Sequence, residues 1–188
     1  MEYFVHSSSI VEKDVIIGQG TKIWHFSHVD VGASIGIECS FGQNVYVGKE
    51  VKIGNYVKVQ NNVSIYQGVE LKDYAFCGPS VVFTNDLSPR SRFPKGKDLF
   101  VRTTVEENVT IGANSTIVCG IIIGQNSMIG AGSVVTKSVL PHELVYGNPA
   151  SHKGWVCECG IRLESTLDCR YCTREYEKTE NGLLRISK

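Results

Sequence analysis

The sequence predicts an all-β fold in which the chain winds as a three-sided parallel β-helix, with one extruded loop and a small cysteine-rich tail. An apolar residue recurs at every sixth position through most of the 188 residues, one interruption falls at 84–103, and four cysteines lie between positions 157 and 172. These three observations predict the fold. We expect residues 1–150 to form the β-helix, with the loop at 84–103, and residues 151–188 to form the tail.

The repeat of six dominates the first 140 residues. Every sixth residue from Val5 to Cys77 is apolar, and the phase resumes from Val105 to Val135. A period of six fits neither an amphipathic helix nor an alternating strand, but it is typical of short strands on the faces of a triangular prism. We expect three hexapeptides to make one coil, and each coil to pair with the next as a parallel ladder around one core. Glycine often follows the apolar residue, as at Gly36, where it eases the turn at the corner.

The interruption at residues 84–103 reads TNDLSPRSRFPKGKDLFVRT. Structureless insertions of this length are uncommon in compact domains and often carry function. The segment contains the basic residues Arg90, Arg92, Lys95, Lys97 and Arg102 against the acidic residues Asp86 and Asp98. This positive excess favours recognition of a phosphate or a carboxylate, although solvated loop surface is the alternative.

Composition and charge exclude several classes of function. The 19 Lys and Arg residues balance the 19 Asp and Glu residues, so the chain lacks the positive field typical of nucleic-acid or anionic-membrane binding. Hydrophobic residues make up 42% of the chain, which is enough for a packed core. The opening MEYFV does not resemble a signal peptide, and no stretch approaches the roughly 18 apolar residues of a membrane span. We expect a cytoplasmic protein with no nucleic-acid partner and no membrane partner.

The hexapeptide pattern, over roughly residues 5–140, resembles the left-handed β-helix of the hexapeptide-repeat acyltransferases. The left hand follows from this resemblance, because the general rule for parallel crossovers favours the right hand. Residues 130–137 and 145–150 resemble the ending of the coenzyme A-dependent members. The resemblance implies a homotrimer with active sites between neighbouring prisms, and acetyl-CoA lying along small residues with lysines near its phosphates. The predicted cofactor-binding residues are Ala113, Ala131, Gly132, Lys137, Pro149 and Lys153.

The residues at the start of the loop bear on the acceptor. An alcohol needs a general base, usually a histidine, to become a nucleophile at neutral pH, whereas an amine on a sugar already has a neutral fraction. Hexapeptide O-acetyltransferases carry such a histidine near the loop, but this loop has none and begins with Thr84-Asn85-Asp86. The amide oxygen of Asn85 could accept a hydrogen bond from the amine and aim its lone pair at the thioester. We predict that Asn85 is the catalytic residue.

Four segments extend the resemblance, namely KIWHFSH at 22–28, FGQNV at 41–45, VQNNVSIY at 59–66 and FCGPSVVFTN at 76–85. They resemble bacterial N-acetyltransferases that modify the 3-amino group of UDP-linked 2-acetamido-3-amino-glucuronic acid for lipopolysaccharide and related glycans. The resemblance implies that Asn85 meets the sugar amine and that the basic loop meets a carboxylate and a diphosphate. Sibling enzymes act on other nucleotide sugars, including dTDP sugars, so the acceptor stays open.

The predicted substrate-binding residues are His25, Gln60, Asn61, Tyr66, Asp86, Arg90 and Arg92. Amides stacked on consecutive turns could instead satisfy one another along a corner of the prism. His25 is the candidate general base if Asn85 only positions the amine. Two alternatives to N-acetyl transfer remain, an O-acetyltransferase acting on a sugar hydroxyl and a non-catalytic β-helix scaffold that binds no coenzyme A.

The tail carries two close thiol pairs, Cys157-x-Cys159 and Cys169-x-x-Cys172. Four thiolates close a tetrahedral zinc site with no open position, so we predict a structural zinc ion. Iron, or an empty reduced site, is the alternative. The scattered cysteines, Cys39, Cys77 and Cys119, are expected to be small buried hydrophobic residues.

Overall fold

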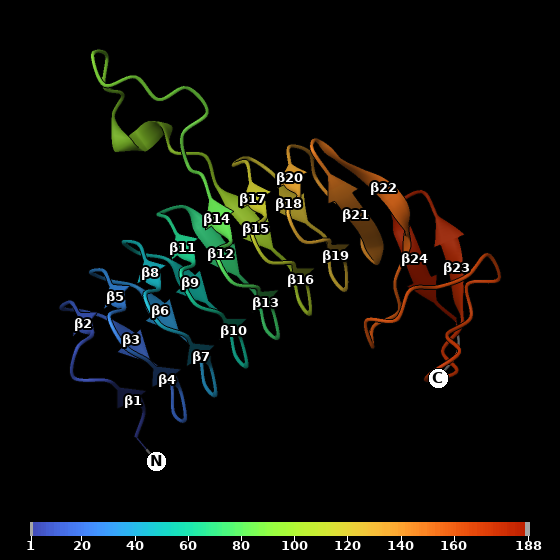
Figure 1. Cartoon of the computed structure of the whole chain (residues 1–188), viewed down its shortest axis with the longest axis horizontal. Coiled ribbons are helices and arrows are strands. Elements are labelled where there is room, and N and C mark those ends of the chain that lie inside the picture. The colour runs from blue at the N-terminus through green and yellow to red at the C-terminus, as the bar shows by residue number, and fades with distance from the viewer. Residues whose placement is uncertain (1, 187–188) are drawn as a thin grey trace.

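A computed structural model describes residues 2–186 and shows the predicted left-handed parallel β-helix, a prism with three flat faces (Figure 1). The helical element within these residues is the three-residue η1 (Lys97–Leu99), so no helix of the described range is long and apolar enough to cross a membrane. Each face of the prism is one parallel sheet, and we name the faces sheet A, sheet B and sheet C in the order in which the chain visits them.

The strands of the three sheets follow one another around the prism. Sheet A contains β1 (Phe4–Val5), β4 (Lys22–Ile23), β7 (Ser40–Phe41), β10 (Lys58–Val59), β13 (Phe76–Cys77), β16 (Thr110–Ile111), β19 (Met128–Ile129), β21 (Glu143–Gly147) and β22 (Ala150–Trp155). Sheet B contains β2 (Ile10–Val11), β5 (His28–Val29), β8 (Tyr46–Val47), β11 (Ser64–Ile65), β14 (Val82–Phe83), β17 (Thr116–Ile117) and β20 (Val134–Val135). Sheet C contains β3 (Ile16–Ile17), β6 (Ser34–Ile35), β9 (Lys52–Ile53), β12 (Val69–Leu71), β15 (Thr103–Val105) and β18 (Ile122–Ile123).

The repeat places one side chain of each strand inside the prism. Phe41 of β7 is fully buried, for example, and its strand partners are Ile23 below and Val59 above. The inward series therefore stacks apolar side chains from coil to coil, as the period of six predicts. In the first coil, Val5 and Val11 are only half-buried, because no coil lies beneath them.

The glycines after the inward residues allow the coils to approach one another. A Cβ atom built on Gly36 would lie 2.4 Å from the carbonyl oxygen of Gly54 in the next coil. The left-handed backbone falls two positions later in the turn, at residues such as Glu38 (φ 54°) and Asn44 (φ 57°). The steric demand at these glycines is thus contact between coils, while asparagine and other residues take the left-handed corner.

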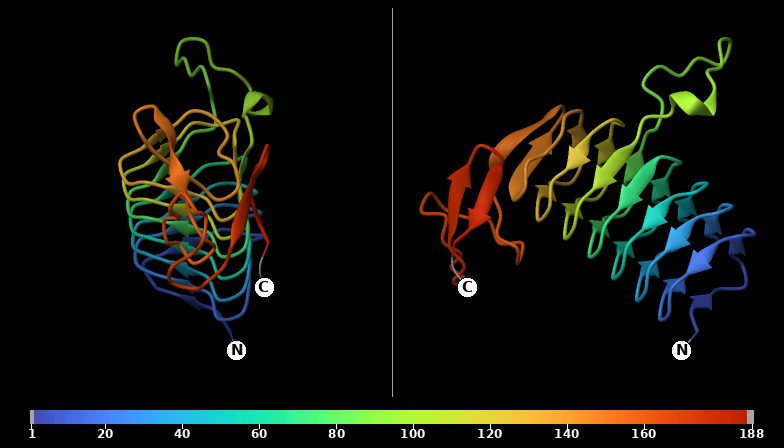
Figure 2. Two further views of the ribbon diagram at one scale, coloured as in Figure 1. Left: turned by 90° about the vertical axis from the view of Figure 1, so that its right-hand side faces the viewer. Right: turned by 180° about the vertical axis from the view of Figure 1, so that it is seen from behind.

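The extruded loop begins at residue 84, because the apolar series from Val5 to Cys77 continues for one more hexad before the chain leaves the prism. Phe83 of β14 is fully buried and continues the phase, and the loop then runs over 84–102 before Thr103 begins β15. The Val101 N–H donates to the Asn85 carbonyl (2.9 Å) and closes the root of the loop. Leu71 still pairs with Val105, so the loop leaves the coil register intact and projects from the prism (Figures 1 and 2).

The tail follows the last coil. Strands β21 and β22 pair as an antiparallel hairpin at the end of sheet A. Strand β22 runs through the expected boundary between the β-helix and the tail, at residues 150 and 151, without a break. Strands β23 (Tyr176–Thr179) and β24 (Gly182–Arg185) form a separate two-stranded sheet beyond the prism (Figure 2). A second buried cluster fills the tail, made of Cys157, Leu163, Cys169, Tyr176 and Leu183.

The three scattered cysteines are buried in the prism, as predicted. Cys77 occupies the inward slot of β13 and is fully buried, while Cys39 and Cys119 are 1% and 4% exposed. Burial raises the pKa of the Cys77 thiol to about 12, so this thiol stays neutral at physiological pH. These residues therefore pack as small apolar side chains.

Candidate active site

The predicted catalytic and substrate-binding residues lie on two of the three corners of the prism. The A–B corner consists of the turns that follow sheet A strands, such as 24–27, 60–63 and 112–115. The B–C corner consists of the turns that follow sheet B strands, such as 48–51 and 66–68, together with the loop at 84–102. The C–A corner consists of turns such as 36–39, 54–57 and 106–109. Sheet B separates the two corners that carry the predicted residues.

Three predicted substrate residues meet in one groove on the A–B corner. His25, Gln60 and Asn61 line a cavity of about 350 Å³ together with Trp24 and Gln43. The rings of His25 and His6 lie against each other, with 3.7 Å between their centroids and a tilt of 32° between their planes. The Gln43 N–H donates to Asn61 Oδ1 (2.8 Å), so Asn61 satisfies a neighbouring coil, as the alternative interpretation of the stacked amides expects. His25 and Gln60 are half-buried and face the groove.

The same corner carries small residues farther along the prism. Ala113 and Gly132 lie on adjacent coils, where the Gly132 N–H donates to the Ala113 carbonyl (2.8 Å). Ala131 is exposed, and a Cβ atom added to Gly132 would meet no atom within 4 Å. This strip leaves room for a narrow chain to lie against the backbone.

Asn85 lies on the B–C corner, at the root of the loop. Its Nδ2 donates to the Gln67 carbonyl of the preceding coil at 3.4 Å, and its Oδ1 has no hydrogen-bond partner within residues 2–186. Gln67 lines a second groove, of about 310 Å³, which lies beside sheet C under the loop. Other residues around this groove include Lys52, Glu70, Asp98, Phe100 and Arg102. The geometry thus leaves the Asn85 amide oxygen available to a ligand.

The charged groups around the second groove compensate one another. Glu70 pairs with Lys72 (Oε1–Nζ 2.5 Å), and this contact raises the pKa of the Lys72 ammonium. Glu70 also pairs in register with Lys52 on the neighbouring strand of sheet C. Arg102 and Asp98 contribute opposite charges from the loop. The groove therefore presents both positively and negatively charged side chains to a ligand.

The other predicted loop residues lie at the surface. The Ser88 N–H donates to Asp86 Oδ1 (2.7 Å), so Asp86 shapes the first turn of the loop. Arg90 and Arg92 are exposed, and Arg92 lies 5.7 Å from the centre of the Phe93 ring. Arg90 and Arg92 are thus open to solvent and do not line the groove beneath the loop, whereas Arg102 does.

Tyr66 and the remaining cofactor residues are spread over several elements. Tyr66 is 41% exposed and its ring lies beside Tyr46. Lys137 is exposed after β20, and Pro149 lies in the turn between β21 and β22. Lys153 of β22 lies over the ring of Tyr146, with 5.4 Å from Nζ to the ring centre. A single chain therefore does not gather the predicted cofactor residues into one pocket.

Sequence reasoning missed several residues that line the two grooves. Trp24 and Gln43 were unassigned, as were Lys52, Glu70 and Phe100. The signal that could have found them is the distance of one coil: outward positions 18 residues apart, such as Lys52 and Glu70, become strand neighbours. Listing outward residues beside the loop at this spacing would have selected both.

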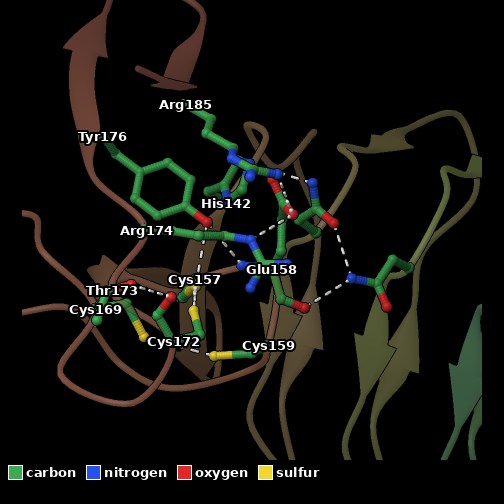
Figure 3. A network of polar contacts seen from close by, with 12 residues as sticks. His142, Cys157, Glu158, Cys159, Cys169, Cys172, Thr173, Arg174, Tyr176 and Arg185 are labelled. Atoms are coloured by element: carbon green, nitrogen blue, oxygen red, sulfur yellow. Dashed lines mark hydrogen bonds and ion pairs between the residues drawn. The ribbon is translucent and has the colours of Figure 1, made fainter. Parts of the chain in front are cut away.

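The four tail cysteines form a compact group that could hold a metal. Their Sγ atoms all lie within 4.8 Å of one another, with 3.3 Å between Cys157 and Cys172 and 3.5 Å between Cys159 and Cys169 (Figure 3). Tetrahedral zinc with Zn–S bonds near 2.3 Å needs sulfur atoms about 3.8 Å apart. Hydrogen bonding from the Arg174 backbone lowers the pKa of Cys172 to about 6, whereas burial raises the pKa of Cys159 to about 12 and also raises that of Cys157. The donor set and its spacing fit a tetrathiolate metal site.

Comparisons with known proteins agree with this architecture. A sequence model of the hexapeptide repeat of succinyl-transferase matches residues 32–67 and 102–137. The chain is 46% identical over 161 residues to dTDP-3-amino-3,6-dideoxy-alpha-D-galactopyranose 3-N-acetyltransferase of Aneurinibacillus thermoaerophilus, a match that covers 86% of this chain and 82% of the relative.

Two solved structures share the fold at low sequence identity. PerB of Caulobacter crescentus, in complex with CoA and GDP-perosamine, has a TM-score of 0.52 at 19% identity, over 82% of this chain and 58% of that chain. The acetyltransferase domain of PglB from Neisseria gonorrhoeae, in complex with acetyl coenzyme A, has a TM-score of 0.52 at 19% identity, over 79% and 56%. This chain thus spans little more than half the length of these two.

The match to the Aneurinibacillus enzyme extends over most of both chains, which shows common family membership. The hexapeptide-repeat prediction is confirmed by the family match and by the three-sheet prism. The chain therefore belongs to the hexapeptide-repeat acetyltransferases, enzymes built on a left-handed β-helix.

Proposed function

We propose that this protein transfers an acetyl group from acetyl-CoA to the 3-amino group of a nucleotide-linked sugar, for synthesis of a bacterial surface polysaccharide. The observation that carries the proposal is Asn85, whose amide oxygen has no hydrogen-bond partner among residues 2–186 and lies at the root of the extruded loop. The relative at 46% identity, a sugar 3-N-acetyltransferase, supports the same acceptor position.

The acceptor differs between the two lines of support. The segment resemblance points to UDP-linked 2-acetamido-3-amino-glucuronic acid, while the relative acts on dTDP-3-amino-3,6-dideoxygalactose. Both sugars carry the reacting amine at C3. We place the dTDP-linked sugar first because the match covers most of both chains, and Arg90 and Arg92 would contact the diphosphate of either substrate.

The chemistry needs positioning more than proton abstraction. The amine nitrogen attacks the thioester carbonyl carbon, the C–N bond forms, and the C–S bond breaks as coenzyme A leaves. The departing thiolate takes the proton that the amine releases. Asn85 Oδ1 accepts a hydrogen bond from the amine. This hydrogen bond directs the lone pair of the amine nitrogen at the thioester carbonyl carbon. His25 on the A–B corner contacts the sugar or nucleotide rather than acting as base.

A homotrimer would complete the site. The A–B corner offers the strip of small residues for the pantetheine arm, and the B–C corner offers Asn85, so one copy alone keeps the two substrates apart. Sheet B lies between these corners, and its outward residues include no lysine, arginine or acid: Ile10, His28, Tyr46, Ser64, Val82, Thr116 and Val134. We propose that copies meet across this face, which sets one A–B corner beside the next B–C corner.

We also propose that one zinc ion binds Cys157, Cys159, Cys169 and Cys172. Four thiolates leave no open coordination position, so the ion supplies structural cross-linking and no catalytic chemistry. The cysteines lie in the tail, and they line neither the A–B groove around His25 nor the B–C groove around Gln67.

The test incubates the purified protein with acetyl-CoA and a panel of nucleotide sugars, followed by mass spectrometry of the products. The panel contains dTDP-3-amino-3,6-dideoxygalactose, the UDP-linked 3-amino uronic acid, and the 3-hydroxy analogue of each. We expect one added acetyl group on a 3-amino sugar and none on its hydroxy analogue. Acetylation of the hydroxy analogues would support O-acetyl transfer instead, and failure to bind coenzyme A would support the scaffold.

A further inference from the structure

We propose that the metal ion locks the tail onto the C–A corner of the prism, so that the tail docks only in the metal-loaded protein. This inference rests on the zinc site proposed above and is independent of acetyl transfer. Its basis is a chain of polar contacts that runs from the prism into the residues beside Cys157 (Figure 3).

A ladder of side chains follows the C–A corner. Asn108, Asn126 and His142 take the same left-handed turn position on successive coils, with φ between 57° and 63°. Asn108 Nδ2 donates to Asn126 Oδ1 (2.8 Å), and Asn126 Nδ2 lies 3.2 Å from His142 Nε2. His142 Nδ1 lies 2.9 Å from the Val156 carbonyl. Because that carbonyl can only accept, Nδ1 carries the proton and Nε2 accepts from Asn126.

The ladder forms hydrogen bonds with the backbone of the metal-binding turn on both sides of Cys157, at Val156 and at Glu158. Before it, Val156 accepts from His142 and donates its own N–H to the His142 carbonyl (2.8 Å). After it, the Glu158 carbonyl accepts from Asn108 Nδ2 at 2.9 Å. Asn108 therefore uses both amide protons, one within the prism and one toward the tail. The backbone of the first thiol pair is thus part of the prism's own hydrogen-bonding ladder.

The second thiol pair is tied to the same place by charge. The Glu158 carboxylate pairs with Arg174 (Nε 3.2 Å) and with Arg185 (Nη1 3.3 Å). Arg174 follows Cys172 by two residues, so an ion that joins the two thiol pairs also holds Arg174 beside Glu158. The Tyr176 hydroxyl reaches Cys157 Sγ (3.1 Å) and accepts from the Glu158 N–H (3.1 Å).

The tail has little apolar material of its own to maintain this arrangement. Its buried cluster comprises five residues, of which two are cysteines of the proposed site, and partly buried Trp155, Ile161, Leu167 and Cys172 pack against it. A segment of this size does not bury enough surface to order itself, and metal binding supplies the missing free energy. Without the ion we expect the turns at 157–172 to open, and the contacts at Val156 and Glu158 to be lost with them.

Docking of the tail also builds a third groove. A cavity of about 400 Å³ lies between the prism, which contributes Tyr74 and Gln125, and the tail, which contributes Glu158, Cys159 and Arg174. The wall from the tail exists only while the metal-binding turns are closed. In the metal-loaded protein this surface of the C–A corner is therefore a groove, and without the metal it is an open corner.

The first experiment compares hydrogen–deuterium exchange in the full-length protein before and after zinc removal by a chelator, with zinc content measured in parallel. We expect one zinc ion per chain, and exchange over residues 156–176 faster by at least about tenfold after removal, with the prism unchanged. The double variant C169S/C172S should reproduce the metal-free pattern. Cys39→Ser is the control, because this buried prism thiol lies outside the metal site.

The second experiment separates metal binding from docking. Asn108→Ala removes the contact with Glu158 and keeps all four cysteines. Asn44→Ala is its matched control: both residues have φ of 57°, and Asn44 Nδ2 donates to Asn62 Oδ1 (3.0 Å) without touching the tail. We expect Asn108→Ala to retain zinc and to raise exchange at 156–158 by about tenfold, while Asn44→Ala leaves it unchanged.

Each outcome decides one part of the inference. A protein without zinc overturns the metal site itself, whatever its acetyl transfer. A tail that stays equally protected without zinc overturns the lock while leaving the metal site in place. Equal exchange in the two asparagine variants overturns the role of the ladder.

Discussion

The B–C corner and the C–A corner place an asparagine at the same position of the turn, but its side chain has a different role on each corner. On the C–A corner, Asn55 Oδ1 accepts from the Ile37 N–H (3.0 Å) and Asn55 Nδ2 donates to Asp73 (3.2 Å), so its amide is spent on neighbouring coils. On the B–C corner, the Asn85 amide makes one long hydrogen bond and the chain departs into the loop. The difference teaches that an asparagine at a corner either holds coils together or remains available to a ligand.

The largest effect should follow Asn85→Ala. We expect kcat for the 3-amino sugar to fall by about 100-fold or more, because the amine loses the group that orients it, with only a modest loss of acetyl-CoA affinity. The free energy of unfolding should change by less than about 1 kcal/mol, since only the 3.4 Å hydrogen bond is lost. Steady-state kinetics and urea unfolding measure the two quantities.

Asn55→Ala is the matched control on the C–A corner. It should show the reverse pattern, a loss of about 1–2 kcal/mol of stability with kcat unchanged, because its amide bonds only to coils. Unchanged turnover in Asn85→Ala would remove Asn85 from the mechanism and cancel the contrast between the corners.

Glycine substitutions should separate two positions within the turn by steric demand, the one directly after the inward residue and the one two residues later. At Gly36 on the C–A corner, a Cβ atom would meet the Gly54 carbonyl at 2.4 Å, so Gly36→Ala should cost about 1–3 kcal/mol or more of stability. At Gly32 on the B–C corner, the nearest atom is Cγ of the flexible Glu50 at 3.4 Å. Gly32→Ala should cost only the strain of its positive φ, about 1–2 kcal/mol. Thermal unfolding of both variants gives the comparison, and a larger loss for Gly32→Ala would contradict it.

The stability that the ladder on the C–A corner contributes to the docked tail should also depend on pH, because the ladder includes His142. Burial lowers the pKa of this imidazole below its usual value near 6.5, and the charge of Glu158, the acid that favours protonation, does not outweigh burial. The folded state therefore binds fewer protons than the unfolded state just below pH 6.5, so the stability contribution is present above that pH and is lost as pH falls. We expect the protection of the tail amides against hydrogen exchange to decrease as the pH is lowered from 7 to 5.

The variant His142→Asn tests this assignment. It places a third asparagine in the ladder and removes the titrating group, so the tail should show a smaller loss of protection over the same pH range. Hydrogen exchange at residues 150–158, compared at several pH values, measures the difference. An identical pH dependence in both proteins would place the titrating group elsewhere.

The smallest effect should follow His25→Asn on the A–B corner. A sugar amine needs no protein base, so we expect kcat to change by less than about threefold. A change in KM alone would fit contact with the substrate. Loss of turnover by 100-fold or more, on the order of a missing general base, would transfer the catalytic role from Asn85 to His25.

Much of the fold could be predicted because each inward position follows from a local count of six. Phe41 and Ile117 are buried in the slots that the repeat assigns, and the loop spans 84–102, which differs from the predicted 84–103 by one residue. The site was harder to predict. His25, Gln60 and Asn61 do meet in one groove, yet Asn61 is engaged by Gln43, and no local pattern distinguishes that amide from the free amide of Asn85.

The prism, the position of the expelled loop and the group of four cysteines follow from the sequence alone, because periodicity and close spacing are local properties of the chain. The tertiary structure alone distinguishes the asparagines that bond to neighbouring coils from the one whose amide oxygen is available to a ligand, since each contact joins residues at least one coil apart. It also showed that Asn108 reaches Glu158 across fifty positions of sequence. Such a contact depends on how the last coil presents the tail, and no periodic pattern encodes it.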